Sequence, residues 1–474
     1  MVRVVLSILA LFASLTLLVS GSSMLGTLLS MRLSLEHFDA AAIGVIMAFY
    51  SLGFVIGTLR APRVIRRVGH IRAFSAFSAI ACASVLLHPI YVNGSFWAVL
   101  RVITGFSVAG LMTVIESWVN TRATNETRGR LLSLYMLIFY SAAAAGQFMI
   151  GLGHPMGFAL FSLVAVLMVL SAVPLSLTRA EAPLLVEVER LPLRKLYRIS
   201  PSGLAGALVT GIVVSDFLAL GPIYATRSGL SVSRVSIFMG VAVFGAMVLQ
   251  WPAGRLADRY DRRRVLIGLT ALAAVASLAA GLFGGYSDAV LFPLAAVFMG
   301  LASSMYPVSV AITNDFMETE QVVNASAGLL LSYGVGTCIG PVAGAVSMRA
   351  VGPAGLFLFS AACLVFLALL VRLQMRRYAS VAVADQGEYV TMPAASTPAL
   401  TELDPRNEGF DEHMEAAESA QEEPLPPEQP PPDIDLPRDS GAAGGPQPLQ
   451  PPEAAVAQPG EGPGQEPGEQ RHEP

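Results

Sequence analysis

Twelve long apolar stretches, separated by short polar segments, constrain this chain more than any other feature of its sequence. Each is about twenty residues long, which is the length that an α-helix needs to cross about 30 Å of hydrocarbon. The bilayer offers no hydrogen-bond partners to an open backbone, so such stretches must be helical. They fall at residues 4–30, 40–59, 73–92, 96–119, 131–152, 156–177, 203–224, 233–253, 265–285, 289–313, 326–348 and 354–373. We therefore expect an all-α polytopic membrane protein; the alternative is a large soluble enzyme with buried helices.

Composition supports the membrane interpretation. Of the 474 residues, 54% are hydrophobic and only 14% are charged, whereas soluble domains carry roughly a quarter of charged residues. The first 24 residues resemble a secretory signal peptide. Their apolar run is longer than the usual 7 to 15 residues, however, so we expect a first transmembrane helix.

The net charge of −4 hides two segments of opposite sign. Residues before Ala379 include 27 basic and 14 acidic side chains, and residues 379–474 include 3 basic and 20 acidic ones. The acidic segment is rich in Pro, Glu and Gly and cannot bury enough apolar area to offset its chain entropy. We expect a disordered tail whose Pro424–Pro432 segment samples polyproline II. A docking role for a partner is an alternative that no motif supports.

Basic residues predict the orientation in the membrane. If the N-terminus is cytoplasmic, the inner loops hold 22 arginine and lysine residues and the outer loops hold 4. Such an excess marks cytoplasmic loops. We expect both termini to lie on the cytoplasmic side of the cell inner membrane. The densest basic cluster, "GRLADRYDRRR" at residues 254–264, would then fix the turn between the eighth and ninth spans on the inside.

The two halves of the membrane body repeat each other weakly, at an offset of 192 to 195 residues. "PRVIRRVGHIR" at 62–72 aligns with residues 254–264, and the surroundings of Gly105 and Gly146 align with those of Gly300 and Gly340. Parallel repeats of this kind are how many secondary transporters are built. We expect an N-terminal six-helix bundle at 1–177, a linker at 178–202, a C-terminal six-helix bundle at 203–373 and the tail at 374–474.

The motif "GRLADRYDRRR" resembles the signature between helices two and three, and between eight and nine, of the major facilitator superfamily. The resemblance covers residues 1–373. Shorter matches resemble the YcaD-type subgroup: "ESW" at 116–118, "RGRLL" at 128–132, "LQWPAGRLAD" at 249–258 and "LLLSYGVGTCIGP" at 329–341. The resemblance implies two pseudo-symmetric six-helix bundles that rock about a central substrate site, and it implies no particular substrate.

The resemblance also implies a cytoplasmic latch, in which Asp258 caps a neighbouring helix and holds an arginine. Its residues are Gly254, Asp258, Arg259, Arg262 and Arg263. A simple positive-inside anchor is the alternative and needs no aspartate. The first-half copy comprises Arg66, Arg67, Gly69 and Arg72, with Arg66 in the place of Asp258. We therefore expect only the second half to keep an intact latch.

Three ionisable residues fall inside predicted spans, where charge is costly and is a functional hypothesis by default. Asp216, in the middle of the seventh span, must pair or stay protonated and is a candidate for proton coupling. Arg101 matches the fourth-helix motif of the family, often tied to proton transfer, or extends to the outer interface. Glu116 either titrates or pairs with an inner-loop arginine such as Arg122.

Other residues are candidates for a central cavity or for close helix packing. Tyr140, Gln147, Tyr306 and Asn314 are polar cavity candidates, each equally suited to a helix–helix hydrogen bond. Gln147 stands where antiporters of the family commonly have proline, which weakens an export role. Small residues and a proline favour close, bent helix packing: Gly105, Gly146, Gly340, Pro341 and Gly344.

No motif suggests an enzyme. The sequence has no nucleophile elbow, phosphate loop or metal-ligand spacing, and Cys82, Cys338 and Cys363 lie unpaired inside apolar spans. We expect no cofactor, no metal and no nucleic-acid partner. The favoured hypothesis is a proton-coupled secondary transporter that moves a small neutral or lipophilic organic solute across the bilayer. The alternatives are a facilitative uniporter and a membrane scaffold or sensor that acts through its tail.

Overall fold

The computed structural model describes residues 2–124, 126–177, 191–317, 321–377, 381–387, 389–390, 393 and 396–401, with side chains from residue 8 onwards. All of them belong to one unit, residues 1–421. Its helices are α1 (Val2–Leu35), α2 (Ala40–Val68), α3 (His70–Leu87), α4 (Gly94–Thr121), α5 (Arg128–Met149), η1 (Ile150–Leu152), α6 (Ala159–Leu170), α7 (Ala172–Ser176), α8 (Leu193–Ile199), α9 (Pro201–Arg227), α10 (Val232–Arg259), α11 (Arg262–Phe283), α12 (Asp288–Asn314), α13 (Val322–Val351), α14 (Gly355–Met375), η3 (Val383–Asp385) and α15 (Pro398–Thr401).

Twelve helical segments of the described chain are long and apolar enough to cross a membrane, as predicted. They are α1 to α5, α6 with α7, and α9 to α14, with η1 extending α5. Several helices run beyond the predicted spans. The second ends at Val68 instead of residue 59, because a helix continues through the polar turn after its apolar part leaves the hydrocarbon.

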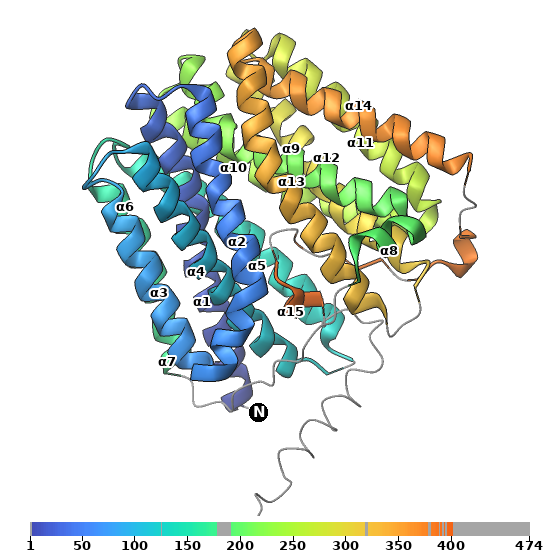
Figure 1. Cartoon of the computed structure of the whole chain (residues 1–474), viewed down its shortest axis with the longest axis horizontal. Helices are drawn as coiled ribbons and strands as arrows, with labels where there is room; N and C mark the ends of the chain where they lie inside the picture. The colour runs from blue at the N-terminus through green and yellow to red at the C-terminus, as the bar shows by residue number, and fades with distance from the viewer. Residues whose placement is uncertain are drawn as a thin grey trace, which may run out of the picture. The chain divides into compact units, whose positions relative to one another are not determined.

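The helices form two bundles with the same internal packing (Figure 1). In the first bundle α1 packs on α5 and α6, and α4 packs on α2 and α3. In the second bundle α9 packs on α13 and α14, and α12 packs on α10 and α11, which are the equivalent pairs six spans later. Across the bundle interface, α2 contacts α13 and α5 contacts α10. Because α10 is the equivalent of α2 and α13 is the equivalent of α5, these two contacts are the same contact seen from each bundle. The predicted pseudo-symmetry is therefore confirmed.

Backbone contact at glycines holds α2 against α4. A Cβ atom placed on Gly53 would lie 2.1 Å from the Val102 carbonyl oxygen, and one on Gly105 would lie 2.2 Å from the Tyr50 carbonyl oxygen. Such distances leave no room for any side chain. Small residues permit this close approach, which stabilises helix pairs in lipid through van der Waals contact.

The second bundle repeats this contact between α10 and α12. A Cβ atom placed on Gly245 would lie 2.3 Å from the Ala296 carbonyl oxygen. One placed on Gly300 would lie 2.6 Å from the carbonyl oxygen of Gly245. Two further glycines repeat another contact, between α1 and α5 and between α9 and α13. Cβ atoms on Gly146 and Gly340 would each lie 2.2 Å from a carbonyl oxygen, of Ser20 and Ile212 respectively.

One end of the unit carries the α2–α3 and α10–α11 turns, and we call it the signature face. At the first turn Gly69 has φ +86° and ends α2, a conformation that glycine adopts without strain. The side chains of Arg66, Arg67 and Arg72 are exposed around it. At the second turn Asp261 accepts hydrogen bonds from the backbone nitrogens of Arg263 (2.8 Å) and Arg264 (3.4 Å) and caps α11.

Replacing Gly105 with valine should separate α2 from α4. The new side chain would meet the Tyr50 carbonyl, so we expect a loss of at least about 2 kcal/mol of stability and a lower unfolding midpoint in detergent. Gly268→Val is the matched control, since a Cβ at this exposed α11 position meets no atom within 4 Å. Equal midpoints for the two variants would contradict the packing role of Gly105.

Candidate functional site

A cavity of about 310 Å³ lies between the two bundles. Its walls come from α1, α2, α4 and α5 of the first bundle and from α9, α10, α12 and α13 of the second, and Pro398 of α15 also lines it. The two sets of bundle helices are equivalent under the internal repeat. The cavity therefore lies at the interface that any movement of one bundle against the other would reshape.

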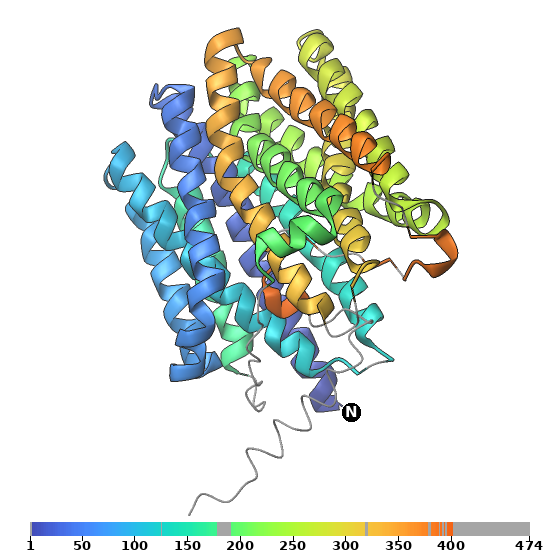
Figure 2. The same ribbon diagram turned by 45° about the vertical axis from the view of Figure 1, so that its right-hand side comes forward.

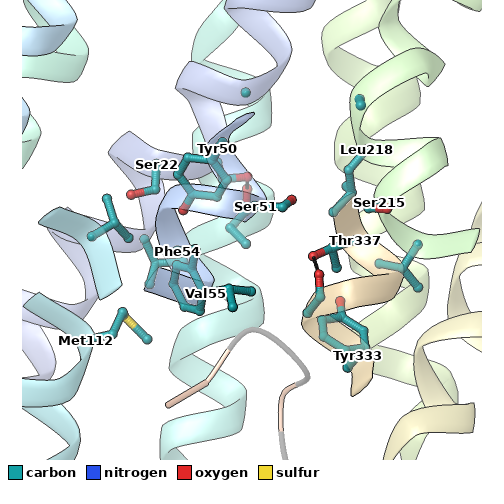
Figure 3. Close-up of a pocket in the computed structure, with 18 of the residues that line it drawn as sticks. Ser22, Tyr50, Ser51, Phe54, Val55, Met112, Ser215, Leu218, Tyr333 and Thr337 are labelled. Atoms are coloured by element: carbon teal, nitrogen blue, oxygen red, sulfur yellow. Dashed lines mark hydrogen bonds between the residues drawn. The ribbon is translucent and has the colours of Figure 1, made fainter. Parts of the chain in front are cut away.

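The cavity wall is mainly apolar, with hydroxyl groups on both sides. Figure 3 shows Tyr50 and Ser51 facing Ser215, Thr337 and Tyr333 across the space. Ligand sites commonly combine an apolar wall with a few placed polar groups. Arg101 is the one charged side chain among the described residues that line it.

Arg101 projects from α4 towards Tyr50 of α2. Its guanidinium carbon lies 4.4 Å from the centre of the Tyr50 ring, a cation–π geometry. The side chain is 4% exposed, and its Nε has no hydrogen-bond partner in the described chain. Gly105, one turn further along α4, contacts the Tyr50 backbone and so helps to place the ring under the guanidinium. Arg101 therefore lines the cavity and does not extend to the outer interface.

Gln147 and Tyr140 of α5 also line the cavity. The Gln147 amide nitrogen donates to the Ser23 carbonyl at 3.0 Å and to its hydroxyl at 2.8 Å, while its Oε1 has no partner in the described chain. The Tyr140 hydroxyl accepts a 2.6 Å hydrogen bond from Gln250 of α10. Gln147 thus joins α5 to α1 within the first bundle, and Tyr140 joins α5 of the first bundle to α10 of the second.

Two of the four predicted cavity residues, Tyr306 and Asn314, do not reach the cavity. The Tyr306 ring packs edge-on against the Tyr333 ring of α13, with 5.2 Å between the ring centres, and this contact fills the space between α12 and α13. Asn314 is buried at the end of α12. Both residues were predicted from their polar side chains, and polarity alone does not show how far along α12 the cavity extends.

Asp216 is fully buried but faces away from the cavity. Its neighbours Ser215 and Leu218 line the cavity, whereas the Asp216 carboxylate lies between α9, α13 and α14. One oxygen accepts a 2.9 Å hydrogen bond from Ser360 of α14, and the other has no partner in the described chain. Gly344 of α13 leaves the room for this carboxylate, because a Cβ there would lie 1.8 Å from it.

Glu116 pairs with hydroxyl and backbone groups, not with Arg122. One carboxylate oxygen accepts a 2.8 Å hydrogen bond from the Tyr135 hydroxyl of α5. The other accepts a 2.9 Å hydrogen bond from the backbone nitrogen of Thr397. The predicted arginine partner is therefore wrong, because a segment beyond the membrane body, invisible in the span pattern, reaches this carboxylate.

In the predicted latch, Asp258 holds an arginine only loosely. Its carboxylate lies 3.9 Å from Arg262 and is half-exposed, and it accepts a 3.1 Å hydrogen bond from the Tyr389 backbone nitrogen. The helix cap expected of Asp258 is made by Asp261. Gly254 lies under the Tyr389 ring, where a Cβ would come within 2.7 Å of the ring. Burial raises the pKa of the Tyr389 phenol above its usual range, so the ring stays neutral.

The buried ion pair of the signature face joins Arg262 to Asp315, which follows α12. Arg262 is 1% exposed and also donates to the Ala311 carbonyl at 3.3 Å and to the Gly387 carbonyl. The Arg263 guanidinium carbon lies 5.2 Å from the centre of the Phe316 ring, and Arg259 is exposed. We did not predict Asp315. An acidic residue at a helix C-terminus interacts unfavourably with the helix dipole. The position of Asp315 at the end of α12 could therefore have indicated that its carboxylate needs a cationic partner.

Sequence comparison identifies relatives along most of the chain. The profile of the Major Facilitator Superfamily matches residues 11–249 and 205–402. The uncharacterized MFS-type transporter YcaD of Escherichia fergusonii is 28% identical over 382 residues, which cover 80% of this chain and 98% of that protein. The YcaD protein of Shigella flexneri is 28% identical over 347 residues, covering 72% and 89%.

Solved structures show the same fold at low sequence identity. A bacterial homologue of the human lysosomal transporter Spinster, inward-facing and unoccupied, has a TM-score of 0.66 at 16% identity, covering 81% of this chain and 98% of its own. The nucleoside transporter NupG has a TM-score of 0.65 at 14% identity, covering 80% and 100%. These structures share the fold, and the matched profile, which spans most of the sequence, shows that the chain belongs to the major facilitator superfamily.

Proposed function

We propose that this protein is a secondary active transporter that moves a small organic solute through the cavity by alternating access. The observation that carries the proposal is the cavity itself, lined by equivalent helices of the two bundles. A site on this interface can open to either face when the bundles rock. The nucleoside transporter NupG and a D-xylose-proton symporter (TM-score 0.61) share the fold, which supports the class of activity and no substrate.

The cavity wall favours a solute with an apolar or aromatic body and at most one negative or hydroxyl-bearing group. Arg101 supplies a single positive charge above Tyr50, and its unpartnered Nε is a free donor in the described chain. The hydroxyls of Ser51, Ser215 and Thr337 offer weaker polar contacts. A highly charged solute would leave most of its charge unpaired on this apolar wall.

A metabolite and drug panel scored by thermal shift on purified protein tests this proposal. A solute at 100 times its Kd should stabilise the protein by about 2.7 kcal/mol and raise its unfolding midpoint. The Arg101→Gln variant should lose this shift. Arg255→Gln, at an arginine stacked on Trp251 outside the cavity, should keep it. Solutes that stabilise Arg101→Gln as well as the wild type would refute the assigned site.

We propose proton coupling through Asp216. Its carboxylate is fully buried; one oxygen accepts the Ser360 hydrogen bond and the other has no partner among the described residues, so the protonated form is the less costly one to bury. Because Asp216 touches α13 and α14 behind the cavity wall, its protonation would act through the packing of the second bundle. The neighbouring Ser215 links this packing to the cavity.

Proteoliposomes loaded with a solute from the panel test the coupling. A protonophore should abolish accumulation against a gradient, and Asp216→Asn should do the same while equilibrative flux persists. Asp288→Asn, which removes a partly exposed partner of Arg234 far from Asp216 in the sequence, is the control and should accumulate normally. Accumulation that a protonophore and Asp216→Asn both leave intact would rule out this coupling, and downhill flux alone in the wild type would favour the uniporter.

The division at residues 177, 202 and 373, and the placement of both termini on the cytoplasmic side of the inner membrane, belong to the same proposal. The signature face then becomes the cytoplasmic face. The supporting observation is the arginine excess of its loops. Arg179 and Arg190, which contribute to that excess, lie outside the described residues, as does the Pro424–Pro432 segment. A scaffold that acts through its tail stays the alternative, and it predicts no solute flux.

A further inference from the structure

Part of the acidic tail is packed into the membrane unit, unlike the solvated extension that composition predicted. Ser396, Thr397 and Leu400 are at most 1% exposed. The short helix α15 contacts α4 of the first bundle and α13 of the second. Figures 1 and 2 show this helix between the two bundles, at the end of the unit where the N-terminus lies. Pro398 is part of the cavity wall.

We propose that residues 396–401 are a plug, bound in a specific site at the mouth of the cavity on the signature face. The site is made by Glu116 and Asn120, one turn apart on α4. Glu116 accepts hydrogen bonds from the Thr397 backbone nitrogen at 2.9 Å and from its hydroxyl at 2.5 Å. Asn120 donates to the Ala399 carbonyl. These hydrogen bonds hold Thr397 and Ala399, two residues apart in the plug, against α4 of the first bundle.

The chemistry of the plug fits this mouth. Its sequence is Ser-Thr-Pro-Ala-Leu-Thr, without a charge in a tail that holds 20 acidic residues. Leu400 packs in the main hydrophobic core, and Ala399 is 7% exposed. A charged segment would leave ions buried next to the Glu116 carboxylate. The tail thus supplies one neutral, compact stretch at the point where the chain meets the cavity.

The segment before the plug is bound by the signature residues of the second bundle. The Tyr389 ring occupies the space left by Gly254, the Tyr389 backbone nitrogen donates to Asp258, and Arg262 donates to the Gly387 carbonyl. The tail is therefore attached first to the second bundle and then, through the plug, to α4 of the first. A segment that bonds to both bundles must leave before they can separate at this face.

Access of a water-soluble maleimide to a cavity cysteine measures the plug directly. The reporter is Ser51→Cys, in a chain whose native cysteines are alanines. Ser51 lines the cavity (Figure 3) and lies 17 residues before the end of α2 at Val68, about 25 Å from the signature face along the helix. Labelling is followed in sealed vesicles whose signature face is outward.

A chain that ends after Ala395 lacks the plug, whereas one that ends after Gln421 keeps it and is the matched control. We expect labelling about tenfold faster without the plug, equivalent to about 1.4 kcal/mol of closure free energy. In the full chain, Leu400→Asp should accelerate labelling similarly. Val383→Asp, at a tail position that is 46% exposed, should not. Equal unfolding midpoints confirm that the compared chains are folded.

Labelling rates that are the same with and without the plug, and unchanged by Leu400→Asp, would overturn the proposal. The access measurement needs no substrate, so it stands apart from the proposed function. The regulatory consequence rests on that function, since the chain ending after Ala395 should transport faster than the one ending after Gln421. Faster labelling with no solute flux in either chain would defeat the transport proposal and leave the plug intact.

Discussion

Backbone-to-backbone contact at glycines is the constraint on which the rest of this structure depends. Lipid tails are as apolar as the helix surfaces, so helices in a bilayer gain little from apolar burial and rely on close packing. Gly53 and Gly105 close α2 on α4, and Gly245 and Gly300 close α10 on α12. With each bundle held together internally, the polar groups of the cavity are left at the interface between bundles, where the contacts are fewer and can change.

The three ionisable residues predicted inside membrane spans lie in three separate places of the unit. Arg101 lies in the cavity wall above Tyr50, Asp216 lies behind that wall in the second bundle, and Glu116 lies at the mouth where it binds Thr397. A charge in the membrane needs a partner or a change of protonation. The three residues differ in their partners: an aromatic ring for Arg101, a serine hydroxyl for Asp216 and the tail for Glu116. The span pattern alone groups the three as intramembrane charges and does not distinguish their surroundings.

The sequence was sufficient to predict the helices and their symmetry, because hydrocarbon thickness sets span length and the repeat aligns equivalent glycines. It was not sufficient for contacts made by the tail. Average composition predicted disorder after residue 379, yet a neutral run of six residues, 396–401, packs into the cavity mouth. Averages over a long acidic segment do not detect such a run. For the same reason the partners of Glu116 and Asp258 could not be predicted from the spans.

The signature residues also make different contacts from those of the expected latch. Asp258 bonds to the tail, while the buried ion pair is Arg262 with Asp315. The pair joins α11 to the end of α12 inside one bundle, so it stabilises that bundle as a rigid body. The tail contacts of Gly254 and Asp258 then connect this rigid body to α4.

Distances between spin labels at the two faces test the rocking of the bundles most directly. One pair replaces the exposed Arg67 and Arg259 at the signature face, and the other replaces the exposed Tyr91 and Tyr286 at the opposite face. In nanodiscs, removal of the plug and addition of a bound solute should lengthen one distance while the other shortens. A single, unchanged distance at both faces under all of these conditions would contradict alternating access.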